Sequence, residues 1–168
     1  MKKFMSIILF SAITSFAFGQ SKAVEEFSNK YKNDRDAKVV SLNGGIFELV
    51  ANIAQFADED EDAEVIGRLA SGIKSMNILS IPMYRAGLET SDIDELKNKL
   101  ISEKYEELMT VREGRDRVYF MAKTGGDKIN NMLMLINSDE DDFTLINIDG
   151  IIDMKDLAYM AKNHDNWH

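Results

Sequence analysis

The sequence predicts an α+β fold: a mixed, mostly antiparallel sheet of about six strands packed with about five helices. Two observations lead to this class. Four apolar runs between Glu107 and Asp149 are separated by three short breaks rich in Gly or Asp, and breaks this short join only neighbouring antiparallel strands. Earlier in the chain, most apolar residues recur at helical spacing. Helices that come early and strands that come late are typical of an α+β layer protein.

The length and composition of the chain exclude several classes of function. The chain has 168 residues, which suits one domain, and its 45% apolar and 29% charged residues are typical of a globular protein. Its formal net charge is -9, and an acidic surface repels phosphate backbones and anionic headgroups. We therefore expect no nucleic-acid partner. The chain has no Cys, which excludes disulfides, thiolate metal sites, Cys nucleophiles and lipid attachment through an N-terminal Cys.

The N-terminal segment has the layout of a secretory signal peptide. Lys2 and Lys3 precede an apolar run that continues to about Phe18, and a small-x-small pattern ends at Gly19. Cleavage is expected between Gly19 and Gln20. The run is shorter than the ~20 residues that span a bilayer, so we favour cleavage over a membrane anchor. Residues 20–168 then form a single α+β domain with a short flexible C-terminal tail, periplasmic or extracellular, with no stable membrane anchor.

The first half of the chain reads as helices around two short strands. Apolar residues at helical spacing predict four helices. The first covers residues 21–33, with Val24, Phe27 and Tyr31 on one side, and the second has the strongest apolar stripe, made of Ile46, Leu49, Val50, Ile53, Ala54 and Ala57. The third follows the acidic run, with Val65, Ile66, Leu69, Ala70 and Ile73, and the fourth continues to about Tyr105, with Ile93, Leu96, Leu100 and Ile101. Lys38–Leu42 and Met76–Met83 read as strands, the second with Pro82 at its end or edge. Ser91 with Asp94 resembles a capping box.

The second half reads as the four-strand meander and a last helix. Met109 and Val111 mark its first strand, and Val118, Phe120 and Ala122 share one face of the second. Met132–Ile136 is apolar on both faces, so we expect a central strand covered on both sides. The fourth strand and the last helix, which starts near Asp153, carry apolar residues Phe143, Leu145, Ile146, Ile148, Met154, Leu157, Ala158 and Ala161. A strand-Asx-Gly-helix pattern occurs at Leu42-Asn43-Gly44 and again at Ile148-Asp149-Gly150, a faint sign of duplication.

Two groups of residues resemble metal-binding sites, and neither meets the requirements of such a site well. The run Asp58–Asp62 would need Gly at the sixth and Glu at the twelfth position of a calcium loop, where Ala63 and Leu69 stand. We interpret that run as an interhelical loop, and Asp139–Asp142 as a hairpin turn. His164 and His168, with Asp165, could share a metal, but they lie in the last five residues, where chains usually fray.

The remaining polar motifs favour structural roles. Asn43-Gly44-Gly45 reads as a tight turn with an N-cap, and Thr124-Gly125-Gly126-Asp127 as a hairpin. Arg112, Arg115 and Arg117 are interleaved with Glu113 and Asp116, which predicts cross-strand ion pairs. Met132 and Met134 are interpreted as core residues.

No catalytic, cofactor-binding or metal-binding residue is assigned, and no cofactor is expected. Our first hypothesis is therefore a non-enzymatic, exported interaction domain that binds an envelope protein or a small ligand through a sheet face or edge. The alternatives are a hydrolase that uses carboxylates alone, which needs two acids with separated pKa values in one pocket, and a calcium-stabilised envelope domain. Ligand identity and oligomeric state stay open.

Several segments resemble one family of exported bacterial proteins. They are the Val-Val-Ser-Leu run at 39–42, the acidic helix pair, Ile-Asp-Glu-Leu at 93–96 and Ile-Asp-Gly-Ile-Ile-Asp-x-x-Asp-Leu at 148–157. The family is catalogued as domain of unknown function 4252. The resemblance implies a place in a Gram-negative envelope, and a link to envelope regulation because members often lie near sigma-factor genes. Many members look like lipoproteins with a Cys after the signal. Gln20 stands in its place here, so lipid attachment is not implied.

Overall fold

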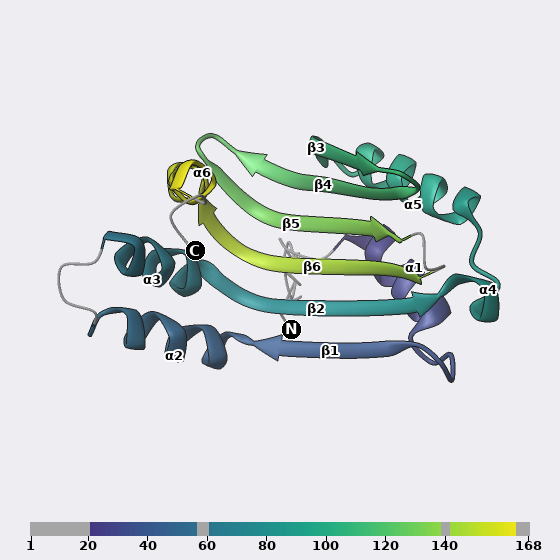
Figure 1. Cartoon of the computed structure of the whole chain (residues 1–168), viewed down its shortest axis with the longest axis horizontal. Helices are drawn as coiled ribbons and strands as arrows, with labels where there is room; N and C mark the ends of the chain where they lie inside the picture. Colours follow the sequence, from purple (N-terminus) through teal and green to yellow (C-terminus); the bar gives the residue numbers. More distant parts are fainter. Residues whose placement is uncertain (1–20, 57–60, 139–141, 164–168) are drawn as a thin grey trace, which may run out of the picture.

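The structure is a computed structural model that describes residues 21–56, 61–138 and 142–163. Within these ranges the chain forms six helices and six strands (Figure 1). The helices are α1 (Lys22–Tyr31), α2 (Gly44–Ala54), α3 (Glu61–Gly72), α4 (Met83–Ala86), α5 (Thr90–Ser102) and α6 (Met154–Asn163). The strands are β1 (Lys38–Asn43), β2 (Ile73–Pro82), β3 (Glu106–Glu113), β4 (Asp116–Gly125), β5 (Lys128–Asn137) and β6 (Asp142–Asp153).

The strands form one sheet in the order β1-β2-β6-β5-β4-β3. Each of its five pairings is antiparallel. Strands β3 to β6 are the predicted meander, and β2 lies beside β6 at the other side. The predicted α+β class is therefore confirmed, with a sheet that is antiparallel throughout.

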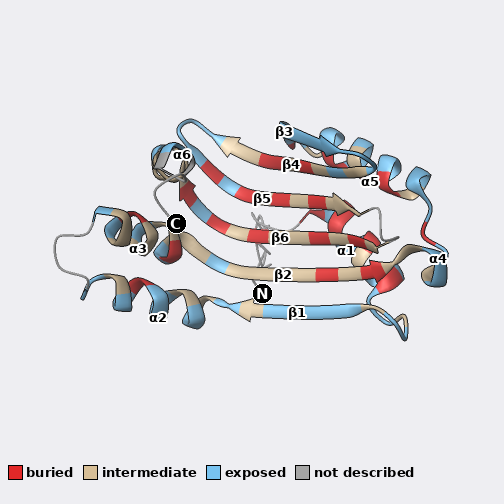
Figure 2. Ribbon diagram, viewed as in Figure 1, coloured by how far each residue is buried: buried red, intermediate tan, exposed pale blue. Residues whose placement is uncertain are grey.

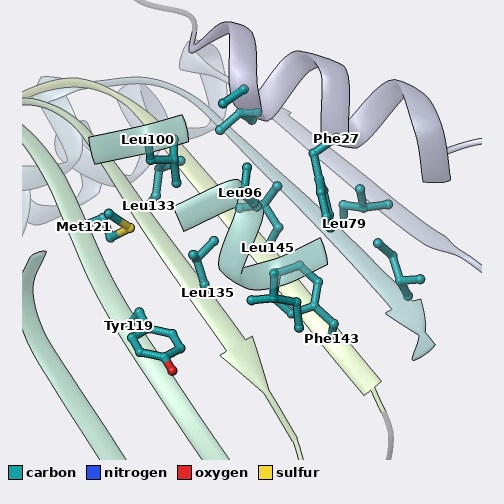
Figure 3. Packing of buried hydrophobic residues seen from close by; sticks show 14 of the residues in the cluster. Phe27, Leu79, Leu96, Leu100, Tyr119, Met121, Leu133, Leu135, Phe143 and Leu145 are labelled. Atoms are coloured by element: carbon teal, nitrogen blue, oxygen red, sulfur yellow. The ribbon is translucent and has the colours of Figure 1, made fainter. Parts of the chain in front are cut away.

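One face of the sheet carries the main core under α1 and α5. The predicted stripe of α1 is buried there, and Phe27 meets Phe143 of β6 edge to face, with ring centroids 5.5 Å apart. Figure 3 shows leucines of β2, β5 and β6 converging with Phe27 of α1 and Leu96 and Leu100 of α5. Burial of these side chains is the main stabilising term of the fold, since each contributes roughly 1.5–3 kcal/mol.

The opposite face is covered at one end only, among the described residues. There Leu69 of α3 and Met154 and Leu157 of α6 pack over a smaller buried cluster of Ala122, Ile129, Ile148 and Ile152. In Figure 1 α3 and α6 lie at one end of the sheet, and no labelled helix is drawn over its middle. The predicted central position of β5 is confirmed. On the second face Met132, Met134 and Ile136 are all half-buried, and of these Met132 packs against the smaller cluster.

Three boundaries differ from the sequence prediction. The capping box at α5 pairs Glu89 with Asp92, so the helix begins two residues before the predicted Ser91–Asp94 box. Strand β2 begins three residues before Met76. Strand β6 continues past Gly150 and ends at Asp153. Only the first of the two strand-Asx-Gly patterns is therefore a strand-to-helix turn.

Candidate interaction surface

Helix α2 presents its large apolar residues to solvent. Asn43 caps the helix by accepting a hydrogen bond from the backbone N–H of Gly45 at 3.1 Å, as predicted. The side that faces α3 carries small residues: Ala51 is buried, and a Cβ on Gly67 of α3 would lie 3.1 Å from the Cβ of Ala54. Phe47, one turn before Ala51 on the same side, is half-buried. The exposed large residues are Ile46, Leu49, Val50 and Ile53 on α2 and Phe56 just after its end, with exposed fractions from 39% to 85%.

Helix α2 therefore has the predicted apolar stripe, but the large residues of that stripe are exposed and are not part of the core. Figure 2 shows α2 mostly in the exposed colour, in contrast to the buried stretches of the central strands. An amphipathic helix of a globular protein normally turns its apolar side inward. Four large exposed apolar side chains on one helix, with Phe56 just after it, instead mark a surface that contacts something else.

A second apolar area lies on the sheet face that faces away from α1 and α5. Because side chains alternate along a strand, the register places one apolar residue from every strand in a single row, namely Val40, Ile78, Ile146, Met134, Phe120 and Met109. The next row away from α3 and α6 is Lys38, Ser80, Thr144, Ile136, Val118 and Val111. All twelve side chains are half-buried or exposed. We call these two rows the open face.

The two edges of the sheet differ in how well they are protected. Strand β3 carries Glu106, Glu107, Arg112 and Glu113 and has a bulge between Glu107 and Met109, features that discourage pairing with another strand. Strand β1 carries one charge, Lys38, and its valines are 53% and 46% exposed. The less protected edge thus adjoins both the open face and α2.

A polar groove of about 320 Å³ lies on the other side of the sheet, between α1 and strands β1, β2 and β6. Its floor includes Ser41, Asn77 and Asn147, which stand opposite one another on adjacent strands. Asn147 accepts a hydrogen bond at 2.9 Å from Asn131, whose side-chain oxygen accepts one at 2.7 Å from the hydroxyl of Tyr105. The groove is large enough for a small polar molecule, and its hydrogen-bonding groups are already partly used by the protein.

The pKa values of two ionisable groups, Tyr105 and Glu107, are shifted by their surroundings. Desolvation, followed by the nearby charges of Glu103 and Asp149, raises the pKa of Tyr105 to about 12, so its hydroxyl stays protonated and donates to Asn131. A hydrogen bond from Thr110, then the ammonium of Lys97 at 3.1 Å, lowers the pKa of Glu107. Lys97 also lies 3.5 Å from the ring centre of Tyr119. These contacts tie α5 to the β3–β4 hairpin, which is a structural role.

The register of that hairpin sets which charged residues stand directly opposite one another. Arg112 faces Arg117, and Glu113 faces Asp116. Directly opposite positions therefore carry like charges, so any ion pair of the predicted kind in this hairpin would be diagonal.

The remaining sequence candidates fall in three groups. His164, Asp165 and His168 lie outside the described residues, as do parts of both acidic runs. Thr124–Asp127 forms the β4–β5 hairpin as predicted, with Gly126 in the left-handed region at φ 69°. Within the described ranges, no three His, Asp or Glu side chains gather in a way that could hold a metal ion.

Sequence reasoning missed the open face for an identifiable reason. Each strand alternates normally, so nothing local indicates that the second face lacks a helix over two of its rows. One signal was present in α2, where Ala51 and Ala54 provide a small-residue side opposite the large apolar one. None of the helices among the described residues is both long and apolar enough to cross a bilayer.

Comparisons with known proteins place the chain by family. No curated protein and no solved structure matches it. The model of one family, described as a domain of unknown function (DUF4252), matches residues 31–160. This range runs from the end of α1 into α6 and includes both α2 and every strand of the sheet. The chain therefore belongs to the DUF4252 family.

Proposed function

We propose that this protein is an exported, non-enzymatic interaction domain that binds a protein partner through α2 and the open face. The observation that carries the proposal is the outward stripe of α2. Its small residues pack on α3 while Leu49, Ile53 and Phe56 remain 53%, 61% and 85% exposed. Water contact with this much apolar surface is unfavourable by roughly 25 cal/mol per Å², so a partner that covers it gains the corresponding free energy.

The chemistry of the surface favours a protein over a small polar ligand. Between Gly44 and Phe56 the only charged residue is Glu48, and the open face carries only Lys38. Interface cores are depleted in charge in this way.

Export is the second part of the proposal. It rests on the layout of residues 1–19, with two lysines, an apolar run and a small-x-small site before Gln20. The partner would then be another protein of the bacterial envelope or of the exterior. Intact mass of the chain recovered from the periplasm and from the medium tests this part: removal of residues 1–19 is expected, and a full-length chain confined to the cytoplasm would refute it.

Site-specific photo-crosslinking in the producing cell tests the interaction. A photoreactive residue at position 49 is expected to give a discrete adduct, and Ile53→Glu in the same chain is expected to abolish it. Position 101 is the matched control, since Ile101 is also apolar and 53% exposed but lies on α5. The proposal would be refuted by equal adduct patterns at positions 49 and 101, or by an adduct at position 49 that forms equally well in the Ile53→Glu variant.

A further inference from the structure

We infer that the partner is a second copy of this chain, with α2 of each copy packed on the open face of the other. The inference rests on the proposed function, because it names the occupant of the same surface. It starts from two apolar surfaces that the described residues leave without a cover, and these surfaces differ in kind. One is a helix without a sheet beneath it, and the other is a sheet face without a helix over two of its rows.

The main core shows how such surfaces fit. There α1 lays Val24, Phe27 and Tyr31, at spacing i, i+3 and i+7, on the inner face of the sheet. Helix α2 offers Ile46, Leu49, Val50 and Ile53 at the same helical spacing. The open face offers a row of apolar side chains that crosses all six strands. A helix with such a stripe packs on such a face by the same side-chain contacts.

The two surfaces are held apart within one chain. The close approach of Ala54 to Gly67 fixes α2 on α3, and α2 continues directly from β1 after Asn43. Figure 1 shows α2 extending past the end of β1, away from the middle of the sheet. Bringing α2 over the open face of its own chain would require breaking both attachments, so α2 of a second molecule is the helix that fits this face.

Charge favours a contact at this place between two acidic chains. Copies with a formal net charge of -9 repel each other unless the contact avoids their acidic groups. The open face contributes only Lys38 and α2 only Glu48, which are opposite in sign. The two areas that would meet thus carry one charge each, and the two charges attract.

The open face has room for the helix. Two rows across six strands project to about 24 by 13 Å, and α2 to about 16 by 10 Å, from standard strand and helix spacings. Each copy contributes its own α2 and the part of its open face that the partner's α2 covers, on the order of 320 Å² in projection, and accessible area exceeds projected area. Interfaces at the small end of the stable class bury about 600 Å² per partner, so a dimer of modest affinity is expected. Because each copy supplies one surface of each kind, a two-fold axis makes the same contact twice and closes the assembly.

Sedimentation equilibrium of the exported chain over a concentration series tests the dimer. The wild type is expected to be dimeric. Ile53→Glu on α2 and Val40→Glu on the open face, both at exposed positions, are each expected to weaken dimerisation at least ~10-fold, because each buries a carboxylate in an apolar contact. Ile101→Glu on α5 is the control and is expected to leave the dimer unchanged. Circular dichroism confirms that each variant is folded.

Mixing the two interface variants separates this arrangement from other dimers. Each variant alone has both contacts damaged. A mixed pair regains one intact contact, between the unaltered α2 of the Val40→Glu chain and the unaltered open face of the Ile53→Glu chain. Partial recovery of dimer in the mixture is therefore expected, whereas dimers built edge to edge or face to face give none.

A wild type that stays monomeric at all concentrations, or a mixture without recovery, overturns the second-copy inference. The crosslinking experiment then distinguishes the two levels of the argument. An Ile53-dependent adduct at position 49 with the mass of a different protein leaves the proposed function standing with another partner. No such adduct refutes both.

Discussion

Gly72 at the end of α3 and Gly150 inside β6 bring two backbones into direct contact. A Cβ on Gly150 would lie 2.3 Å from the carbonyl oxygen of Gly72, and one on Gly72 would lie 2.2 Å from the carbonyl oxygen of Ile151. Real Cβ atoms do not approach backbone oxygens so closely. Through this contact the junction of α3 and β2 packs directly against β6, beside the smaller cluster that α3 and α6 cover.

Gly150→Ala is therefore expected to lower the free energy of unfolding by about 3 kcal/mol, because one of two backbones must shift. Urea denaturation measures it. Gly87→Ala is the matched control: Gly87 has φ 65° and no atom within 4 Å of the added Cβ, so only the backbone strain of about 1–2 kcal/mol applies. Equal losses in the two variants would show that the close approach is not rigid.

Tyr105→Phe tests the buried chain of hydrogen bonds. The change leaves the side-chain oxygen of Asn131, which is 3% exposed, without the donor now 2.7 Å away. Leaving a buried acceptor unpaired costs about 1–3 kcal/mol, and urea denaturation should show a loss in that range. Tyr84→Phe is the control because Tyr84 is 91% exposed. An equal and negligible effect of both changes would contradict a structural role for the bond.

The same tyrosine predicts a loss of stability in alkali. Its pKa is raised to about 12 in the folded protein, chiefly by burial, from about 10 in the unfolded chain. Below pH 10 both states keep the proton. Between pH 10 and 12 the unfolded state loses the proton first, so stability falls as the pH rises. Tyr105→Phe should make this part of the profile flatter, and an unchanged slope would count against the assignment.

Asp92 predicts a loss of stability in acid. Its pKa is lowered by a hydrogen bond from the backbone N–H of Glu89, then by Lys30 of α1, whose ammonium lies 2.9 Å from it. A lowered pKa in the folded state contributes stability above the ordinary pKa of an Asp, and this is lost as the pH falls through the folded value. Asp92→Asn should flatten the acid limb of the profile. An acid limb that is unchanged in Asp92→Asn would contradict the assignment.

How much of this fold follows from the sequence depends on what periodicity reports. The stripes of α1 and α5 predict most buried residues correctly, since Val24, Phe27, Ile93, Leu96 and Leu100 all lie in the main core. The prediction is wrong for Ile101, which is 53% exposed. In α2 the same kind of stripe faces solvent. Periodicity shows that a helix has an apolar side, and does not show what covers it.

The missing parts are the contacts between distant segments. The pairing of β2 with β6 joins residues about seventy positions apart, and no local pattern encodes that choice. Gly150 illustrates the same point, because an Asp-Gly pair reads as a turn, whereas its neighbour Gly72 makes it a point of close backbone approach inside a strand. The open face could not be predicted either, since it results from how far α3 and α6 extend over the sheet.

The orientation of α2 gives the last prediction. Leu49→Gln and Ile53→Gln should each change the stability of the monomer by no more than about 0.5 kcal/mol, because both side chains are exposed and lose no packing. Ala51→Leu should cost about 1–3 kcal/mol, because the added atoms enter the close contact with α3. Urea denaturation at several protein concentrations, extrapolated to the dilute limit, isolates the monomer from association. If the two Gln variants were the destabilised ones and Ala51→Leu were neutral, the large side of α2 would face the core, and the interaction surface would lose its main element.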